Sequence, residues 1–479
     1  MLRRYHRAAA KAAGLHPDVV HHWLRDLPMR RKRWASAAGF LALLACYGPL
    51  VTRAADALPT PKKLKARSFD SGFALSHGTF NGMSFASDGK IYYVLCSDSI
   101  DTGAQMYSYN PATDQIRHIG DLTEASGEKG LKAIPQGKSH VNFVESNGKL
   151  YFATHVGYYT IRGGRETMGV PPPGYKPYPG GHFLAYDMAS GKFENLAAAP
   201  AEQGIISMNM DTKRGRLYGL TWPSGYFLRY DLAGASLKNL GATSQKGEAG
   251  SGPTYRVLCR SLAVDPEDGS VYLTTSDGDI LRYRYDRDAI ETIAGEDLRK
   301  DYFGSYDPST PGHMGYNWRQ TVWYPPENLI YAVHGNSGYL FRFDPRAPRV
   351  DVLDRLTSEP SKRSGMYDLF TYGYLGFALG PDGHTLYYLT GGPIYENGRR
   401  VSGDSSIKVG VKGEEDLHLI TYDIPTATYA DRGAIFLPDG QRLLDVNSIA
   451  VANANTVYSL ARFKENGHER VDLIRIQIE

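Results

Sequence analysis

Residues 217–231 read Leu217-Tyr-Gly-Leu-Thr221-Trp-Pro-Ser-Gly-Tyr-Phe-Leu-Arg-Tyr-Asp231, and this stretch decides the fold. One apolar strand ends at a threonine, a glycine turn follows, and the next strand closes on Tyr-Asp. Apolar and polar residues alternate along these strands, which is typical of half-buried β-strands. The same plan returns in residues 271–286 and 331–344. Internal repetition of this kind predicts a repeat architecture.

Working outward from this repeat, each unit is expected to hold four antiparallel strands. Hairpin dipeptides such as Asp268-Gly269 join the first two strands, and a fourth strand follows each Tyr-Asp pair. The repeated Tyr-Asp ends themselves are expected to be structural turns. We therefore predict an all-β fold, a seven-bladed β-propeller with blades at residues 71–122, 138–198, 203–242, 255–295, 315–357, 372–437 and 446–479.

The last predicted blade supplies only three strands before the chain ends. A strand near residues 64–69 is expected to complete it, so that an N-terminal strand closes the ring and leaves no open sheet edge. Because a closed ring has no natural break, residues 58–479 are expected to form a single propeller domain. Residues 1–57 are expected to be an N-terminal extension with a signal peptide.

The N-terminal segment reads as an export signal. Residues 1–57 hold ten basic and three acidic residues, and the basic run at 29–33 precedes an apolar stretch at 35–51 and an Ala-Asp-Ala sequence at 55–57. Met29 is then a candidate for the true start. The alternative is a lipoprotein processing site with a lipid anchor on Cys46. The expected location is periplasmic or secreted, with no transmembrane span after cleavage because the apolar stretch is short.

The remaining chain holds 44 basic and 48 acidic residues. This slightly acidic balance lacks the electrostatic footprint of nucleic-acid binding, so no nucleic acid is expected among the partners.

In a propeller, the inner strand of each blade starts at the face where the second strand ends. Loops from both positions therefore meet around the mouth of the central channel, where a ligand site is expected. Polar and aromatic residues gather at these positions: His140, His155, Asn209, Trp222, Arg256, Arg260, Asn317, Arg319, His334, Tyr374. A long insertion at 156–181, which carries Tyr158 and Tyr159, and a second at 391–416 belong to the same face.

Each of these residue types has two interpretations. The histidines His140, His155 and His334 suit a divalent metal ion, or else they bond the neighbouring backbone. Arginines suit an anionic ligand, or else they pair with acidic residues between blades. Trp222 suits stacking on a sugar ring, or else it fills a contact between blades. Arg256, Asn317 and Tyr374 complete the expected substrate-binding set.

The blade pattern resembles seven-bladed propellers of the NHL/YVTN type, and it is also similar to propeller-type polysaccharide lyases and the virginiamycin B lyase type. The lyase resemblance implies an exported enzyme that acts by β-elimination on a uronic-acid-containing glycan. In that mechanism Arg260 or Arg319 neutralises the substrate carboxylate, His140 or His155 takes the proton, and Tyr158 or Tyr159 protonates the leaving oxygen. A divalent metal ion is the one cofactor it implies.

The alternative is a non-catalytic propeller that binds or organises partners in the cell envelope. It needs the same fold and the same aromatic rim, but no base and acid directed at one atom. In either case the expected partner is a carbohydrate or another small anionic ligand.

Overall fold

The computed structural model describes residues 62–162, 165–364, 376–390, 394–396, 399–401 and 417–478. All described residues belong to one compact unit, which spans residues 61–479. The expected signal peptide, Met29, Cys46 and Tyr374 lie outside the described residues.

The described part of the chain is an all-β structure, as predicted, and five of its sheets have four antiparallel strands in sequence order. The first two sheets are β2 (Met83–Phe85), β3 (Ile91–Leu95), β4 (Gln105–Asn110), β5 (Gln115–Asp121), and β6 (Val144–Ser146), β7 (Lys149–Ala153), β10 (His182–Asp187), β11 (Lys192–Ala198). The next three are β12 (Gly204–Asp211), β13 (Arg216–Trp222), β14 (Tyr226–Asp231), β15 (Ser236–Ala242); β16 (Ala263–Val264), β17 (Val271–Thr274), β18 (Asp279–Arg284), β19 (Ala289–Asp297); and β20 (Trp318–Tyr324), β21 (Leu329–His334), β22 (Tyr339–Asp344), β23 (Arg349–Arg355).

A nine-stranded sheet joins the two ends of this unit. Its strands are β24 (Phe377–Leu379), β25 (Thr385–Leu389), β28 (His418–Asp423), β29 (Thr428–Phe436), β1 (Lys63–Ser68), β33 (His468–Gln477), β32 (Thr456–Glu465), β30 (Asp445–Val446) and β31 (Ala450–Asn453). Strand β1 pairs antiparallel with β33 and parallel with β29. The N-terminal strand therefore adds to the last strand of the chain, as the sequence predicts.

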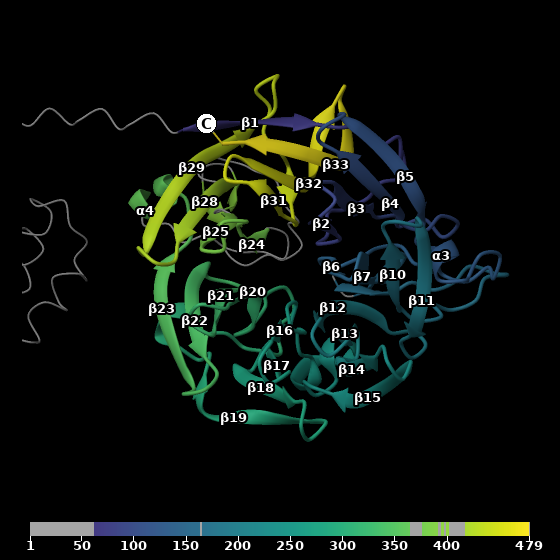
Figure 1. Ribbon diagram of the computed structural model, residues 1–479, viewed down its shortest axis with the longest axis horizontal. Coiled ribbons are helices and arrows are strands. Elements are labelled where there is room, and N and C mark those ends of the chain that lie inside the picture. Colours follow the sequence, from purple (N-terminus) through teal and green to yellow (C-terminus); the bar gives the residue numbers. More distant parts are fainter. Residues whose placement is uncertain are drawn as a thin grey trace, which may run out of the picture. The chain divides into compact units, whose positions relative to one another are not determined.

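The sheets are arranged around a common centre (Figure 1). Short strands such as β2, β16 and β24 lie innermost, and strands such as β5, β15 and β23 lie at the periphery. This is a β-propeller-type fold. It places the starts of the inner strands, and the loops that precede them, around the central axis.

Apolar side chains pack between neighbouring sheets all the way round. One core lies between the sheets of β2–β5 and β6–β15, and another spans the sheets of β12–β23. The last strands also pack on the first sheet, where the rings of Tyr109 in β4 and Tyr458 in β32 lie 5.7 Å apart. These buried faces hold each sheet between two others, so the hydrophobic effect fixes where every inner strand starts.

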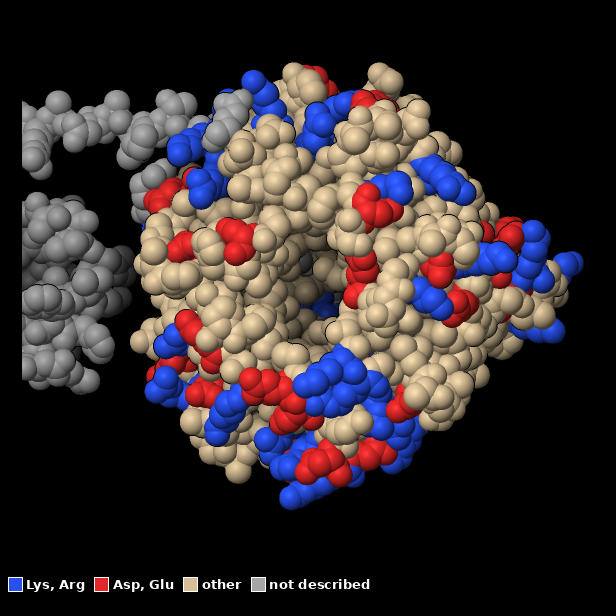
Figure 2. Space-filling view, in the orientation of Figure 1, with Lys and Arg blue, Asp and Glu red and all other residues tan. Residues whose placement is uncertain are grey.

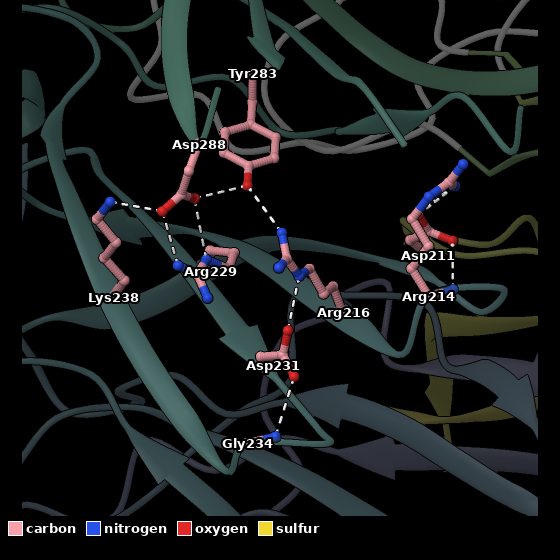
Figure 3. A network of polar contacts seen from close by, with 9 residues as sticks. All are labelled: Asp211, Arg214, Arg216, Arg229, Asp231, Gly234, Lys238, Tyr283 and Asp288. Atoms are coloured by element: carbon pink, nitrogen blue, oxygen red, sulfur yellow. Dashed lines mark hydrogen bonds and ion pairs between the residues drawn. The ribbon is translucent and has the colours of Figure 1, made fainter. Parts of the chain in front are cut away.

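The Tyr-Asp ends are turns, which confirms that prediction. At four of these ends the aspartate accepts a hydrogen bond from a backbone N–H two or three residues on, as Asp231 does from Gly234 at 3.1 Å and Asp344 from Arg346 at 2.8 Å. The turn at Asp231 lies beside a wider network (Figure 3), in which Asp288 accepts from Tyr283, Arg229 and Lys238. This network ties β14 and β15 to the next sheet.

Other elements in the described residues are short. They are the hairpins β8 (Tyr159–Arg162) with β9 (Arg165–Met168) and β26 (Ile394–Glu396) with β27 (Arg399–Val401), the helices α3 (Leu122–Ala125) and α4 (Glu359–Ser364), and the 3-10 turns η1 (Gly247–Ala249), η2 (Gly252–Thr254) and η3 (Asp301–Phe303). No helix among the described residues is long and apolar enough to cross a membrane.

Candidate functional site

Two histidines lie close together in the second sheet, His140 before β6 and His155 after β7. The backbones of Lys138 and His155 bond each other in both directions, with N···O distances of 3.0 and 2.8 Å. The hydroxyl of Ser139 donates to the carbonyl of Ala153 at 2.9 Å. This short pairing extends the sheet beyond β6 and carries the imidazole of His140 to 4.7 Å from that of His155, measured between ring centres.

Glycines make room for this arrangement. A Cβ atom on Gly204, the first residue of β12, would lie 2.9 Å from two ring carbons of His155. A Cβ atom on Gly157 would lie 1.9 Å from the carbonyl oxygen of Ser97. Only a residue without a side chain fits at either position, and the imidazole of His155 occupies the space at Gly204.

The protonation of His155 follows from its neighbours. Its Nδ1 lies 2.9 Å from the carbonyl oxygen of Val156, and because a carbonyl only accepts, Nδ1 carries the hydrogen. The other ring nitrogen, Nε2, then holds a lone pair. Within the described part of the chain it has no hydrogen-bond partner and is shielded from solvent. The ring thus presents an unprotonated nitrogen inside the site.

Tyr159 and Trp222 lie against the same imidazole. The hydroxyl of Tyr159 donates to the carbonyl of Val156 at 2.9 Å and is 3.2 Å from Nδ1 of His155. The ring of Trp222 is 5.4 Å from the imidazole and 5.6 Å from the phenol. Because Trp222 is only 4% exposed, its ring contributes to packing here.

Glu248, in η1, connects Trp222 to an arginine. Its carboxylate accepts from the indole N–H of Trp222 at 2.9 Å, from the guanidinium of Arg260 at 2.6 Å and from the backbone N–H of Leu258 at 3.1 Å. Arg260 is buried and also donates to the carbonyl of Leu258 at 2.9 Å. The cation is therefore held in one place beside the aromatic residues.

Lys138 contributes a second cation. Its ammonium lies 4.1 Å from the ring centre of Phe80 and 4.1 Å from that of Tyr159. The ring of Phe80 is in turn 4.4 Å from the imidazole of His140. Lys138 is 6% exposed, so its charge acts in a poorly solvated environment.

Arg319 in β20 contributes a third cation and links distant parts of the chain. Its guanidinium donates to the side-chain oxygen of Asn447 at 3.3 Å, and the amide of Asn447 donates to the carbonyl of Thr79 at 3.0 Å. Thr79, which precedes β2, and Asn447, which precedes β31, are thus linked to Arg319 in β20. Because these positions lie at the inner strands of three different sheets, the contact lies near the axis of the sheets.

We call the residues that these contacts join the central cluster: Phe80, Lys138, His140, His155, Tyr159, Trp222, Glu248, Arg260, Arg319. The cluster contains three cations and one carboxylate. One face of the unit is hollowed at its middle, and basic side-chain atoms are visible within the hollow (Figure 2). A cluster with this composition is suited to an anionic ligand.

The electrostatics of the cluster keep both imidazoles neutral. Desolvation by the surrounding protein lowers the pKa of His140 well below its ordinary value, and His155, Lys138, Arg260 and Arg319 lower it further. Desolvation and Lys138 do the same to the pKa of His155. Burial raises the pKa of the Tyr159 phenol well above its ordinary value. Both imidazoles are therefore able to accept a proton, and the phenol retains one.

His140 and His155 differ in access. His155 is 1% exposed, whereas His140 and Tyr159 retain partial exposure. Of the two imidazoles, that of His140 is therefore the more accessible.

Several residues predicted for the site make their contacts elsewhere. Arg256 is bound to Asp277 at 2.7 Å. Asn317 is fully buried and bonds Thr274 and the carbonyls of Val257 and Met314. Arg256 thus pairs with an acidic residue of its own predicted blade, and Asn317 bonds neighbouring protein groups.

Two more predicted residues, His334 and Tyr158, have other contacts. The ring of His334 stacks on Phe303 at 4.3 Å, and its Nδ1 bonds the hydroxyl of Ser337 at 2.8 Å. Tyr158 is half-buried and packs on Gly169, whose N–H donates to its carbonyl at 3.1 Å. Tyr374 is outside the described residues, so the structure does not place it.

The predicted metal ion finds no complete ligand set in the described ranges, where no three His, Cys, Asp or Glu side chains gather in a way that could hold one. The His140–His155 pair supplies two nitrogens, whereas catalytic zinc sites use three protein ligands. The described residues therefore do not fit a metal ion.

Sequence reasoning missed Phe80, Lys138 and Glu248. Lys138 had a signal, because it precedes His140 by two residues and side chains two apart in an extended strand share a face. No sequence signal marked Glu248, because it lies in a 3-10 turn between two sheets.

A separate pocket of about 260 Å³ lies where β12, β16 and β20 end. Asn209, near the end of β12, lines it together with Asp211 and Trp323. Sequence reasoning would put Asn209 at the start of its inner strand. It lies instead near the opposite end, because β12 already begins at Gly204.

Comparisons with known proteins add only a general likeness. No family model matches the chain, and no curated protein does. A chain of the mitotic checkpoint complex is similar in structure with a TM-score of 0.47 and 11% identity, over 95% of this chain and 100% of that one. A protein from Bacteroides uniformis, provisionally assigned as a 6-phosphogluconolactonase, is similar with a TM-score of 0.41 and 12% identity, over 73% and 82%.

Proposed function

We propose that this protein is an exported carbohydrate-active enzyme, a lyase that cleaves a uronic-acid-containing glycan by β-elimination at the central cluster. One observation carries the proposal: the neutral imidazole pair of His140 and His155 lies beside the Tyr159 hydroxyl and within the electrostatic influence of Arg260 and Arg319. β-Elimination next to a carboxylate needs these three functions, a base, an acid and a cation, at one place.

The cations have the first role. A uronate presents its carboxylate beside the carbon whose proton must leave, and this proton is weakly acidic while the carboxylate is charged. Arg260 and Arg319 supply positive charge that stabilises the enolate-like transition state. Arg260 acts from a fixed position because Glu248 holds it, and Asn447 holds Arg319.

His140 is the proposed base and Tyr159 the proposed acid. An unprotonated imidazole nitrogen of His140 takes the proton at C5, the electron pair forms the C4–C5 double bond, and the bond from C4 to the glycosidic oxygen breaks. The Tyr159 hydroxyl protonates that oxygen as it leaves. The low pKa of His140 in the free protein keeps it ready as a base, and an arriving carboxylate raises that pKa toward a value suited to proton transfer.

The fold gives this site its position. We infer that the described sheets form a ring of seven blades, in which the nine-stranded sheet counts as two. The pairing of β1 with β33 and the packing of Tyr458 on Tyr109 support closure. The N-terminal basic and apolar segment supports a periplasmic or secreted location.

Purified protein is to be incubated with a panel of uronic-acid glycans, with and without divalent metal ions, while absorbance at the unsaturated-uronate band is followed. We expect absorbance to rise with at least one glycan. His140→Asn should lower the rate by 100-fold or more, on the order of the contribution of general base catalysis. His384→Asn is the matched control, because His384 is on a hairpin turn and pairs with Asp423.

If absorbance stays flat across the panel while the same glycans bind, the protein is a binding propeller and the enzymatic proposal fails. Equal rates for His140→Asn and wild type would remove His140 from the mechanism.

A further inference from the structure

Lys138 contacts both a histidine and the phenol of the central cluster. Its backbone pairs with His155, its ammonium lies over the ring of Tyr159, and His140 follows it by two residues. The ammonium is sandwiched between two aromatic rings at equal distances of 4.1 Å.

The charge of Lys138 reaches every titratable member of the imidazole pair. It lowers the pKa of His140 together with His155, Arg260 and Arg319, and it lowers the pKa of His155 together with Arg260. Tyr159 faces different groups, which are Glu166, Tyr178, Cys96 and Glu248, all of which raise its pKa. Lys138 thus both contacts the phenol ring and acts on the two imidazoles.

We propose that Lys138 is a positioning residue of the central cluster, which orients the Tyr159 hydroxyl toward His155 and places a positive charge beside both imidazoles. The assignment of a role in turnover rests on the proposed function. The electrostatic part does not, because it concerns the ligand-free protein.

The orienting part follows from the geometry. A cation over the face of a phenol fixes the plane of that ring through the attraction of the ring quadrupole. With the plane fixed, the hydroxyl reaches the Val156 carbonyl at 2.9 Å and Nδ1 of His155 at 3.2 Å. An apolar chain of the same length would fill the space between the rings but would not supply this attraction.

The test is a titration of the histidine imidazoles by NMR in the full-length protein. His140→Asn and His155→Asn identify the two signals. In Lys138→Met, which keeps the apolar stem and removes the charge, we expect the pKa of both imidazoles to rise. Lys138→Arg, which keeps the charge, should restore values near those of the wild type. Lys192→Met, at an exposed position in β11, is the matched control and should change neither.

The same variants separate the two proposals. If Lys138→Met leaves both imidazole signals unchanged, Lys138 does not set their charge and this inference fails, whatever the glycan panel gives. If the signals move as expected but no glycan is cleaved, the inference stands and the lyase proposal fails. Where activity exists, the acidic limb of the pH–rate profile should move to higher pH in Lys138→Met and return in Lys138→Arg.

Discussion

The imidazole rings of His140 and His155 lie 4.7 Å apart, with His140 partly exposed and His155 buried behind it. The inner histidine is fixed by a backbone carbonyl and a phenol, and the outer one lies against Phe80. The fixed ring of His155 therefore supports the more accessible ring of His140.

Gly204→Ala should displace His155. The added methyl group would come within 2.9 Å of the imidazole, which has no free space to move into because Trp222 and Tyr159 pack on it. We expect a loss of about 1–3 kcal/mol in the free energy of unfolding, the usual effect of overpacking. Urea unfolding measures it. Gly234→Ala, where the nearest atom is 3.5 Å away, is the matched control. A fully stable Gly204→Ala protein would show that the ring is not confined.

Glu248→Ala should destabilise the cluster strongly. Its removal leaves the Arg260 charge and the indole N–H of Trp222 without this acceptor in a buried setting. Breaking a buried ion pair in this way typically costs about 3–5 kcal/mol. Glu194→Ala, which removes an exposed pair with Lys149, should cost less than about 1 kcal/mol. Equal losses in the two variants, measured by urea unfolding, would contradict the assigned role of Glu248.

Acid should weaken the fold through the buried histidines. Desolvation lowers the pKa of His334 from 6.5 to about 3. The unfolded chain therefore takes up the proton first, so stability is complete above about pH 6.5 and falls as the pH decreases toward 3. Each such histidine contributes a slope of about 1.4 kcal/mol per pH unit within that window.

Substitution tests this linkage at one residue. His334→Gln should reduce the pH dependence of the free energy of unfolding by about one proton between pH 6.5 and 5. The measurement is urea unfolding at a series of pH values. An unchanged slope in the variant would mean that His334 does not stay neutral in the folded protein.

Strand β1 should be essential to stability. Leu64 is buried and its strand pairs with both β29 and β33. Leu64→Ala should lower the free energy of unfolding by about 2–5 kcal/mol, the range for large-to-small changes in a core. Leu75→Ala, at a side chain that is 50% exposed, should have little effect. Similar thermal unfolding of the two variants would argue against a closing role for β1.

Much of the architecture could be predicted from the sequence because the period-two pattern repeats. The repeat at 203–242 matches strands β12 to β15, and the expected strand near 64–69 is β1. The approach of His140 to His155 also followed from where strands begin and end. These features depend on local alternation and on turns, which a single sequence displays directly.

The partners of individual side chains could not be predicted in the same way. Asn317 was predicted to bind substrate because it is polar and lies at the start of an inner strand. Its side chain instead makes three hydrogen bonds to neighbouring protein groups, and the sequence does not show these partners. Glu248 lies between sheets, where no periodicity marks it, yet it fixes Arg260 and Trp222. Asn209 was misplaced because counting along β12 does not reveal where that strand starts.

The central claim is that His140, His155 and the cations around them form one site for an anionic sugar. The most direct test adds a galacturonate oligomer to the ligand-free protein and follows the histidine imidazole signals by NMR. We expect the signals of His140 and His155 to move together, with one dissociation constant, while those of His334 and His384 stay still. Movement confined to other histidines, or none at saturating oligomer, would contradict it.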